Sequence, residues 1–149
     1  MTRVDFYVLE DQAVQARERF ACRLVEKAWR LQHTVYLHAA TAEEAQQLDG
    51  LLWTFSDRSF LPHVLDEPGL DAELAAATPV RVGAGKEPGF DAELLVNLSD
   101  AVPLFFSRFD RVAEIVGGDA QQRTVARDRF RFYRDRGYSL ETHRIGSRA

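Results

Sequence analysis

Cysteine and lysine are both scarce in this chain of 149 residues. Cys22 is the single cysteine, so the chain forms no internal disulfide and offers no cysteine-based zinc site of its own. It falls within a helix-like pattern, which favours a small buried apolar residue. Lys27 and Lys86 are the only lysines, so arginine carries almost all of the positive charge. A guanidinium group donates two parallel hydrogen bonds to a carboxylate or a phosphate, which an ammonium group does not match.

Long apolar runs are also missing. None approaches the roughly 20 residues that a membrane-spanning helix needs. The N-terminus, "MTRVDFYVLEDQ", is acidic where a signal peptide has its apolar core and cleavage site. These absences predict a cytoplasmic protein. The histidines have no metal-ligand spacing, so we expect neither a metal nor a cofactor, and we assign structural or surface roles to His33, His38, His63 and His143.

The glycines of nucleotide-binding motifs are absent as well. The turn after the first predicted strand reads "EDQAVQAR", whereas the dinucleotide fingerprint needs glycine there so that the backbone can approach the pyrophosphate. The predicted loop "GAGKEPG" at 83–89 begins with "GAGK", which resembles the end of a phosphate loop. However, Glu87 and Pro88 follow in place of Ser or Thr, and no helix begins there. We therefore predict no catalytic residues. A nucleotide-using enzyme stays an alternative, because catalytic sites assemble in space.

What the sequence does contain is a regular alternation of strand and helix patterns. Residues 3–9 predict a strand, 13–32 a long amphipathic helix, and 34–39 a second strand. The apolar stripe of that helix consists of Val14, Ala21, Leu24, Val25, Ala28 and Leu31. Thr41 and Glu44 form a capping box for a helix over 41–53, and residues 54–78 look irregular. Further strands are predicted at 79–83, 92–99 and 111–117, a short helix at 103–109, and a final helix from Asp119 to about 136 that ends at Gly137. The pattern predicts one α/β domain over 1–149, with a mostly parallel sheet of about five strands, flanking helices and a flexible last few residues.

Arginine is concentrated near the C-terminus. Residues 119–149 hold eight arginines and four acidic residues and sum to +4, so the rest of the chain sums to −8 within the net charge of −4. At about 100° per residue, the last helix places four guanidinium groups on one stripe with apolar residues on its flank. Arg129 and Arg136 fall on neither the stripe nor a clean core face. The stripe consists of Arg123, Arg127, Arg131 and Arg134, and Phe130 and Gly137 border it.

Arginine beside a shallow apolar pocket suits a ligand that carries a carboxylate and a hydrophobic group, such as a peptide C-terminus ending in Phe. Two other interpretations stay open. The stripe can be a solvated face with i,i+4 support, or it can bind the phosphates of single-stranded nucleic acid. The acidity of the whole chain argues against extended nucleic-acid binding.

A second feature is the aromatic segment "LLWTFSDRSFLPH" at 51–63. Its large apolar residues either plug the core or form an anchor patch for a partner protein, since aromatic anchors dominate interface energetics. His63 is either a rim contact or a hydrogen-bonding residue of the core. The candidate interface consists of Trp53, Phe55, Phe60, Leu61, Pro62 and His63.

Taken together, these patterns resemble the chi subunit of bacterial DNA polymerase III holoenzyme. The resemblance covers nearly the full chain and is carried by "DFYVL", "LDGLLWTFSDRSFLPH", "LLVNLS" and "ARDRFRFYRDRGYSL". It implies a Rossmann-like fold without nucleotide binding and a noncatalytic accessory subunit in DNA replication. It also implies two partners: the psi subunit, which links chi to the clamp loader, and the acidic C-terminal tail of single-stranded-DNA-binding protein, which ends in Pro-Phe. Contact with DNA is then indirect.

The resemblance also assigns residues. Arg127 matches the key tail-binding arginine of the family, Arg123 stands where relatives can have Lys, and Phe130 where they can have Tyr. Trp53 and Phe60 match the aromatic residues that contact psi, or another clamp-loader component where no psi subunit is recognisable. The full candidate tail site is Arg123, Arg127, Phe130, Arg131, Arg134, Gly137 and Tyr138.

Overall fold

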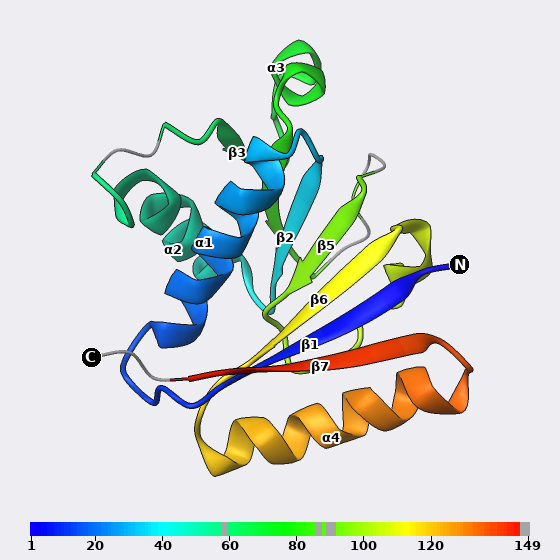
Figure 1. The fold of residues 1–149 in the computed structure, drawn as a ribbon. Coiled ribbons are helices and arrows are strands. Elements are labelled where there is room, and N and C mark those ends of the chain that lie inside the picture. Colours follow the sequence, from blue (N-terminus) through cyan, green and yellow to red (C-terminus); the bar gives the residue numbers. More distant parts are fainter. Residues whose placement is uncertain (58–59, 86–87, 89–91, 147–149) are drawn as a thin grey trace.

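A parallel sheet organises the chain (Figure 1). The computed structural model describes residues 1–57, 60–85, 88 and 92–146. Lys86, Glu87 and Gly89 of the predicted loop and the last residues 147–149 therefore lie outside the described part. In chain order the elements are β1 (Arg3–Leu9), α1 (Ala16–Arg30), β2 (Val35–Ala39), α2 (Ala42–Thr54), β3 (His63–Leu65), α3 (Ala72–Ala77), β4 (Val80–Ala84), β5 (Leu94–Asn97), the 3-10 helix η1 (Phe106–Arg108), β6 (Arg111–Val116), α4 (Ala120–Asp135) and β7 (Ser139–Ile145).

Within those described residues, seven strands pair in the order β3-β4-β2-β5-β6-β1-β7, and every pairing is parallel. Helices α1 and α2 cover one face, while α4 covers the other together with the segment around η1 (Figure 1). This arrangement confirms the predicted α/β, Rossmann-like class. None of the helices described is long and apolar enough to cross a membrane.

The prediction of about five strands was wrong, because β3 and β7 were not recognised. β3 has only three residues and lies in the stretch 54–78 that looked irregular, as does the short helix α3. β7 reads "SLETHRI", and all of its residues are exposed or half-buried. It therefore lacks the apolar alternation that marks a strand against a core.

Helix α1 begins three residues later than predicted. Asp11 Oδ1 accepts a hydrogen bond from the Ala13 N–H at 2.8 Å, and Gln15 adopts a left-handed φ of 64°, so the chain turns before it becomes helical. Val14, which was assigned to the apolar stripe, is consequently 91% exposed. Ala21 and Val25 of the same stripe are buried against the sheet, as predicted. Leu31 is not, because α1 ends at Arg30 and leaves Leu31 63% exposed.

The predicted ends of the other main helices are confirmed by their contacts. Thr41 Oγ1 accepts from the Glu44 N–H at 3.1 Å at the start of α2. Asp119 Oδ1 accepts from the Gln122 N–H at 2.8 Å at the start of α4. At the other end of α4, Gly137 has a φ of 80°, the left-handed conformation that stops a helix.

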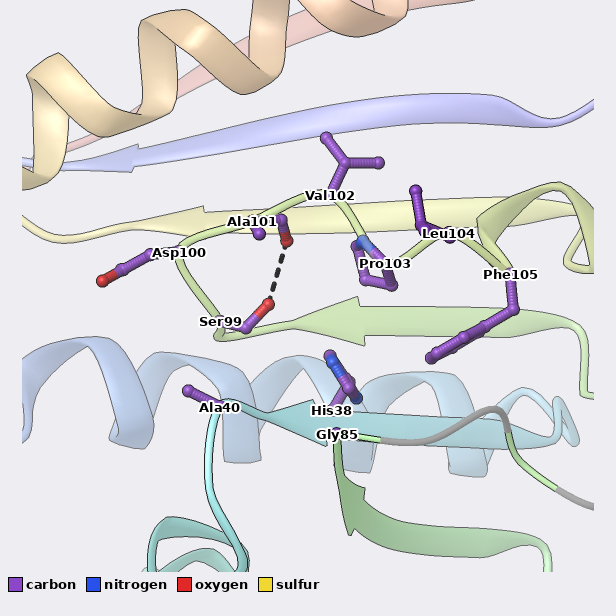
Figure 2. A pocket seen from close by; sticks show the side chains of 10 residues that line it. All are labelled: His38, Ala40, Gly85, Ser99, Asp100, Ala101, Val102, Pro103, Leu104 and Phe105. Atoms are coloured by element: carbon purple, nitrogen blue, oxygen red, sulfur yellow. Dashed lines mark hydrogen bonds between the residues drawn. The ribbon is translucent and has the colours of Figure 1, made fainter.

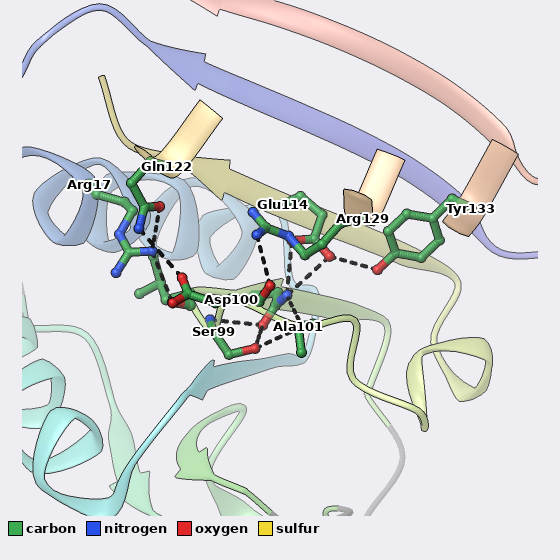
Figure 3. Close-up of polar contacts among 10 residues, drawn as sticks. Arg17, Ser99, Asp100, Ala101, Glu114, Gln122, Arg129 and Tyr133 are labelled. Atoms are coloured by element: carbon green, nitrogen blue, oxygen red, sulfur yellow. Dashed lines mark hydrogen bonds and ion pairs between the residues drawn. The ribbon is translucent and has the colours of Figure 1, made fainter. Parts of the chain in front are cut away.

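A buried polar network fixes α4 against the sheet (Figure 3). It explains why Arg129 lies off the arginine stripe of this helix. Arg129 Nε lies 2.9 Å from Glu114 Oε1, and the two side chains are almost fully buried. The hydroxyl of Tyr133 donates to Glu114 Oε2 at 2.6 Å, and Asn97 Nδ2 donates to both carboxylate oxygens. Burial raises the pKa of Glu114, while Arg129 and these hydrogen bonds oppose the rise. Arg136 also has a partner, since its guanidinium lies 3.5 Å above the ring of Phe132.

Candidate functional site

A pocket of about 250 Å³ opens between α4 and the strands β1, β6 and β7. Its floor is apolar because the side chains that β1 and β6 turn toward α4 are Phe6, Val8 and Val116. The Phe130 ring packs edge-on against Phe6, with ring centroids 5.4 Å apart. The remaining lining residues are Arg123, Ala126, Arg127, Thr142 and Arg144.

Three exposed arginines surround this apolar floor. Within the part of the chain that the structure describes, the guanidinium groups of Arg123, Arg127 and Arg144 form no ion pair and no side-chain hydrogen bond. By contrast, Arg131 lies 3.4 Å from Asp128, and Arg134 lies 3.2 Å from Asp135. The pocket thus combines an apolar floor with three uncompensated positive charges, which suits a ligand with carboxylates and one apolar group.

The structure divides the predicted tail site into two groups. Arg123, Arg127 and Phe130 converge on the pocket, as the helical stripe suggested. The other four residues do not line it: Arg131 and Arg134 pair with neighbours on the same helix, Gly137 ends the helix, and Tyr138 packs on Phe106 with ring centroids 5.0 Å apart.

Sequence reasoning missed the wall that β7 contributes. Thr142 and Arg144 reach the pocket from this strand, two positions apart as side chains on one face must be. The alternation of Leu140, Thr142 and Arg144 in "SLETHRI" was a possible signal. It carries little apolar contrast, so the strand itself went unrecognised.

The aromatic segment separates into exposed and buried residues. Trp53 is 60% exposed and Phe60 is 83% exposed, so neither is a core plug. Leu61 is buried in the core, and Phe55 packs against it while half-buried. Pro62 is exposed beside them.

His63 is a hydrogen-bonding residue of the interior. Its Nδ1 lies 2.8 Å from the Leu61 carbonyl oxygen and its Nε2 lies 3.1 Å from the Asp49 carbonyl oxygen. Its ring also contacts that of Trp53, with centroids 4.4 Å apart, so it supports the exposed tryptophan from beneath. A partner at this face would therefore meet chiefly Trp53 and Phe60.

A larger pocket of about 640 Å³ lies at the carboxyl ends of β2 and β5, the edge at which parallel α/β sheets bind nucleotides (Figure 2). Val102, Pro103, Leu104 and Phe105 make much of its wall apolar. The described residues that line it include no Lys or Arg to pair with phosphates. His38 faces it from β2; burial lowers the pKa of His38 to about 4, so its ring is neutral at pH 7.

The single cysteine and one cluster of possible metal ligands have structural explanations. Cys22 is buried, which confirms the prediction of a small buried residue, and burial raises the pKa of its thiol to about 12. Asp5, Glu141 and His143 lie close enough together to share a cation. However, Arg111 lies 2.9 Å from Asp5 Oδ2 and Arg3 lies 3.4 Å from Glu141 Oε2, so guanidinium groups already balance both carboxylates.

The family model described as "DNA polymerase III chi subunit, HolC" matches residues 1–141. The chain belongs to this family. The DNA polymerase III subunit chi of Pseudomonas aeruginosa is 48% identical over 145 residues, which cover 97% of this chain and 98% of that protein. The corresponding subunit of Haemophilus influenzae is 28% identical over 142 residues, covering 95% and 96%. These matches confirm the resemblance to the chi family that the sequence motifs indicated.

The fold itself is more widespread than the chi family. The crystal structure of T4 UvsW matches with a TM-score of 0.69 at 9% identity, covering 97% of this chain and 42% of that one. At such low identity the likeness shows a shared fold alone. The pocket beside α4 must therefore be judged on its own residues.

Proposed function

We propose that this chi-family chain is a noncatalytic adaptor of the DNA polymerase III holoenzyme. It holds the acidic C-terminal tail of single-stranded-DNA-binding protein in the pocket beside α4. Its exposed aromatic face docks the psi subunit or another clamp-loader component. The observation that carries the proposal is a set of three arginines around an apolar pocket that form no ion pair with any residue the structure describes.

The chemistry of an acidic peptide ending in Phe fits this pocket. The terminal phenyl ring would rest among Phe6, Val8 and Phe130, while carboxylates would pair with Arg123 and Arg127. A charge-assisted hydrogen bond contributes about 1.5–3 kcal/mol, and micromolar affinity corresponds to about 8 kcal/mol. A few such bonds together with burial of the ring are enough for a micromolar site.

The position of the two surfaces supports bridging. The tail pocket lies at β7, one edge of the sheet, whereas Phe60 precedes β3, the opposite edge, and Trp53 contacts His63 of that strand. Separate surfaces allow both partners to bind one molecule at once. The result would be a tether between the polymerase assembly and coated single-stranded template, strengthened by the several tails that a coat presents.

A peptide titration tests the tail site. We expect Arg127→Ala to weaken binding of an acidic Pro-Phe-terminated peptide at least about tenfold, because a charge-assisted hydrogen bond is lost. Arg131→Ala is the matched comparison: it removes the same charge from the same helix but outside the pocket, so its effect should be below about threefold. Equal effects of the two variants, or none from Arg127→Ala and Arg123→Ala, would show that the pocket is not the binding site.

Two controls separate this adaptor from other functions. A bare oligonucleotide should bind more weakly than the peptide; tighter binding with a steep salt dependence would instead indicate a direct nucleic-acid-binding protein.

Phe60→Ala should keep the affinity for the peptide but reduce co-purification with clamp-loader components. Unchanged co-purification would remove the aromatic face from the proposal.

A further inference from the structure

Strand β7 forms an open edge of the sheet. Among the described residues it is the last strand in the sheet order and pairs with β1 alone, over the register Arg3↔Ser139 to Leu9↔Ile145. An edge strand presents a row of main-chain N–H and C=O groups that can pair with another extended chain. In β7 this row lies directly beside the pocket that the tail is proposed to occupy.

The pairing register identifies which residues face outward. The Glu10 N–H donates to the Ile145 carbonyl oxygen at 3.0 Å, so Ile145 turns its main-chain polar groups toward β1. In a parallel ladder the direction alternates along the strand. The main-chain N–H and C=O groups of Ser139, Glu141 and His143 therefore also point toward β1. Those of the intervening residues point away from β1, that is, outward from the sheet. Those outward residues are Leu140, Thr142 and Arg144.

The outward main-chain groups are free within the part of the chain that the structure describes. Neither Thr142 nor Arg144 has a main-chain hydrogen bond to a turn, loop or cap there. The same two residues also give their side chains to the pocket. This segment of β7 thus lines the pocket with two side chains. Roughly perpendicular to them, it also presents main-chain N–H and C=O groups that have no partner among the described residues.

Charge decides which kind of chain this edge accepts. Arg144 on the strand and Arg123 and Arg127 across the pocket form no ion pairs among the described residues. A second copy of β7 would bring its own arginine against these three, whereas an acidic chain would complement them. The sugar-phosphate backbone of a nucleic acid has no N–H and C=O groups to extend a sheet, so an acidic peptide is the occupant that uses both features.

We propose that the acidic tail binds as an added strand along β7, with its main chain hydrogen-bonded to Thr142 and Arg144 and its terminal aromatic ring in the pocket. This inference rests on the proposed tail-binding function and extends it from side-chain to main-chain recognition. Main-chain pairing provides affinity that depends little on the sequence of the tail, while the pocket selects for an aromatic last residue.

Amide hydrogen exchange on the full-length protein tests the added strand. With a saturating acidic Pro-Phe-terminated peptide, the N–H groups of Thr142 and Arg144 should exchange at least about tenfold more slowly, because each gains an acceptor. The N–H groups of Glu141 and His143, already paired with β1, should change less and serve as the internal control. If the peptide binds in an Arg127-dependent manner but Thr142 and Arg144 stay unprotected, the added strand is wrong and the tail site stands. If the peptide does not bind at all, both proposals fail.

A pair of substitutions at one position gives an independent measurement. Thr142→Pro removes an outward N–H, which an edge strand tolerates, and should weaken peptide binding at least about tenfold. Thr142→Ala removes the hydroxyl and γ-methyl groups but keeps the main-chain N–H, so its effect should be clearly smaller. Equal effects of the two substitutions on a folded protein would contradict main-chain pairing.

Discussion

Arg129 shows how burial assigns different roles to arginines of one helix. It is enclosed between α4 and the sheet, with Glu114 as its counter-charge. Arg127, two positions earlier, is exposed at the pocket. Because separating two buried charges leaves one of them unpaired in an apolar environment, Arg129 contributes to stability, whereas Arg127 is available to a ligand.

The buried pair yields a stability prediction. Arg129→Met should lower the free energy of unfolding by about 3–5 kcal/mol, because Glu114 is left buried without its partner. Adding Glu114→Gln to the same variant should recover part of the loss. Arg131→Met, which breaks an exposed pair, should cost less than about 1 kcal/mol. Urea unfolding measures all three, and an equal cost for Arg129→Met and Arg131→Met would show that the buried pair contributes no more than a surface one.

His38 yields a prediction of pH dependence. Its pKa is lowered to about 4 by burial, so between that value and its unfolded pKa of about 6.5 the unfolded chain binds more protons. This contribution to stability is present above the unfolded pKa and is lost as the pH falls toward the folded pKa. Wild type should therefore lose about 2 kcal/mol more than His38→Leu between pH 7 and pH 5. Parallel pH profiles of the two proteins in urea unfolding would contradict the burial effect.

At the scale of single elements, glycine has opposite effects in α2 and after α4. Gly137 adopts a φ of 80°, and an added Cβ would meet no atom within 4 Å, so only the backbone conformation opposes a side chain. Gly137→Ala should destabilise the protein by about 1–2 kcal/mol. Gly50, inside α2 and also with open space around it, should behave oppositely, with Gly50→Ala stabilising by about 0.5–1 kcal/mol. Thermal unfolding compares the two, and a shift of the same sign for both would contradict this account.

The elements also show how far the sequence could lead. Caps made by Thr41 and Asp119 depend on neighbours a few residues away, so the helix starts that they mark could be predicted. The stop at Gly137 is equally local. β7 depends on pairing with β1, more than 130 residues earlier in the chain, and its own residues carry little apolar pattern. This difference between local and long-range contacts also explains the outcome at the pocket. Arg123, Arg127 and Phe130 lie on one helix and could be found in the sequence, whereas Thr142 and Arg144 lie on β7 and could not.

At the scale of the whole molecule, the sheet separates the two proposed binding surfaces. In the part of the chain that the structure describes, β3 and β7 are its two edges and five strands lie between them. The sheet that separates them is buried and fully paired, and such elements are among the least deformable parts of a domain. Binding at one edge should therefore leave the geometry of the binding surface at the other edge unchanged.

This separation predicts independent binding. The dissociation constant of the acidic peptide should change less than about twofold when a saturating clamp-loader component occupies the aromatic face, because the two ligands share no residue and neither reorganises the sheet. A fluorescently labelled peptide titrated into the free protein and into the purified complex measures both constants. Phe60→Ala, which leaves the aromatic face unoccupied, is the control. Competition between the two ligands would place both partners on one surface, and a bridging role would then require two copies of the chain.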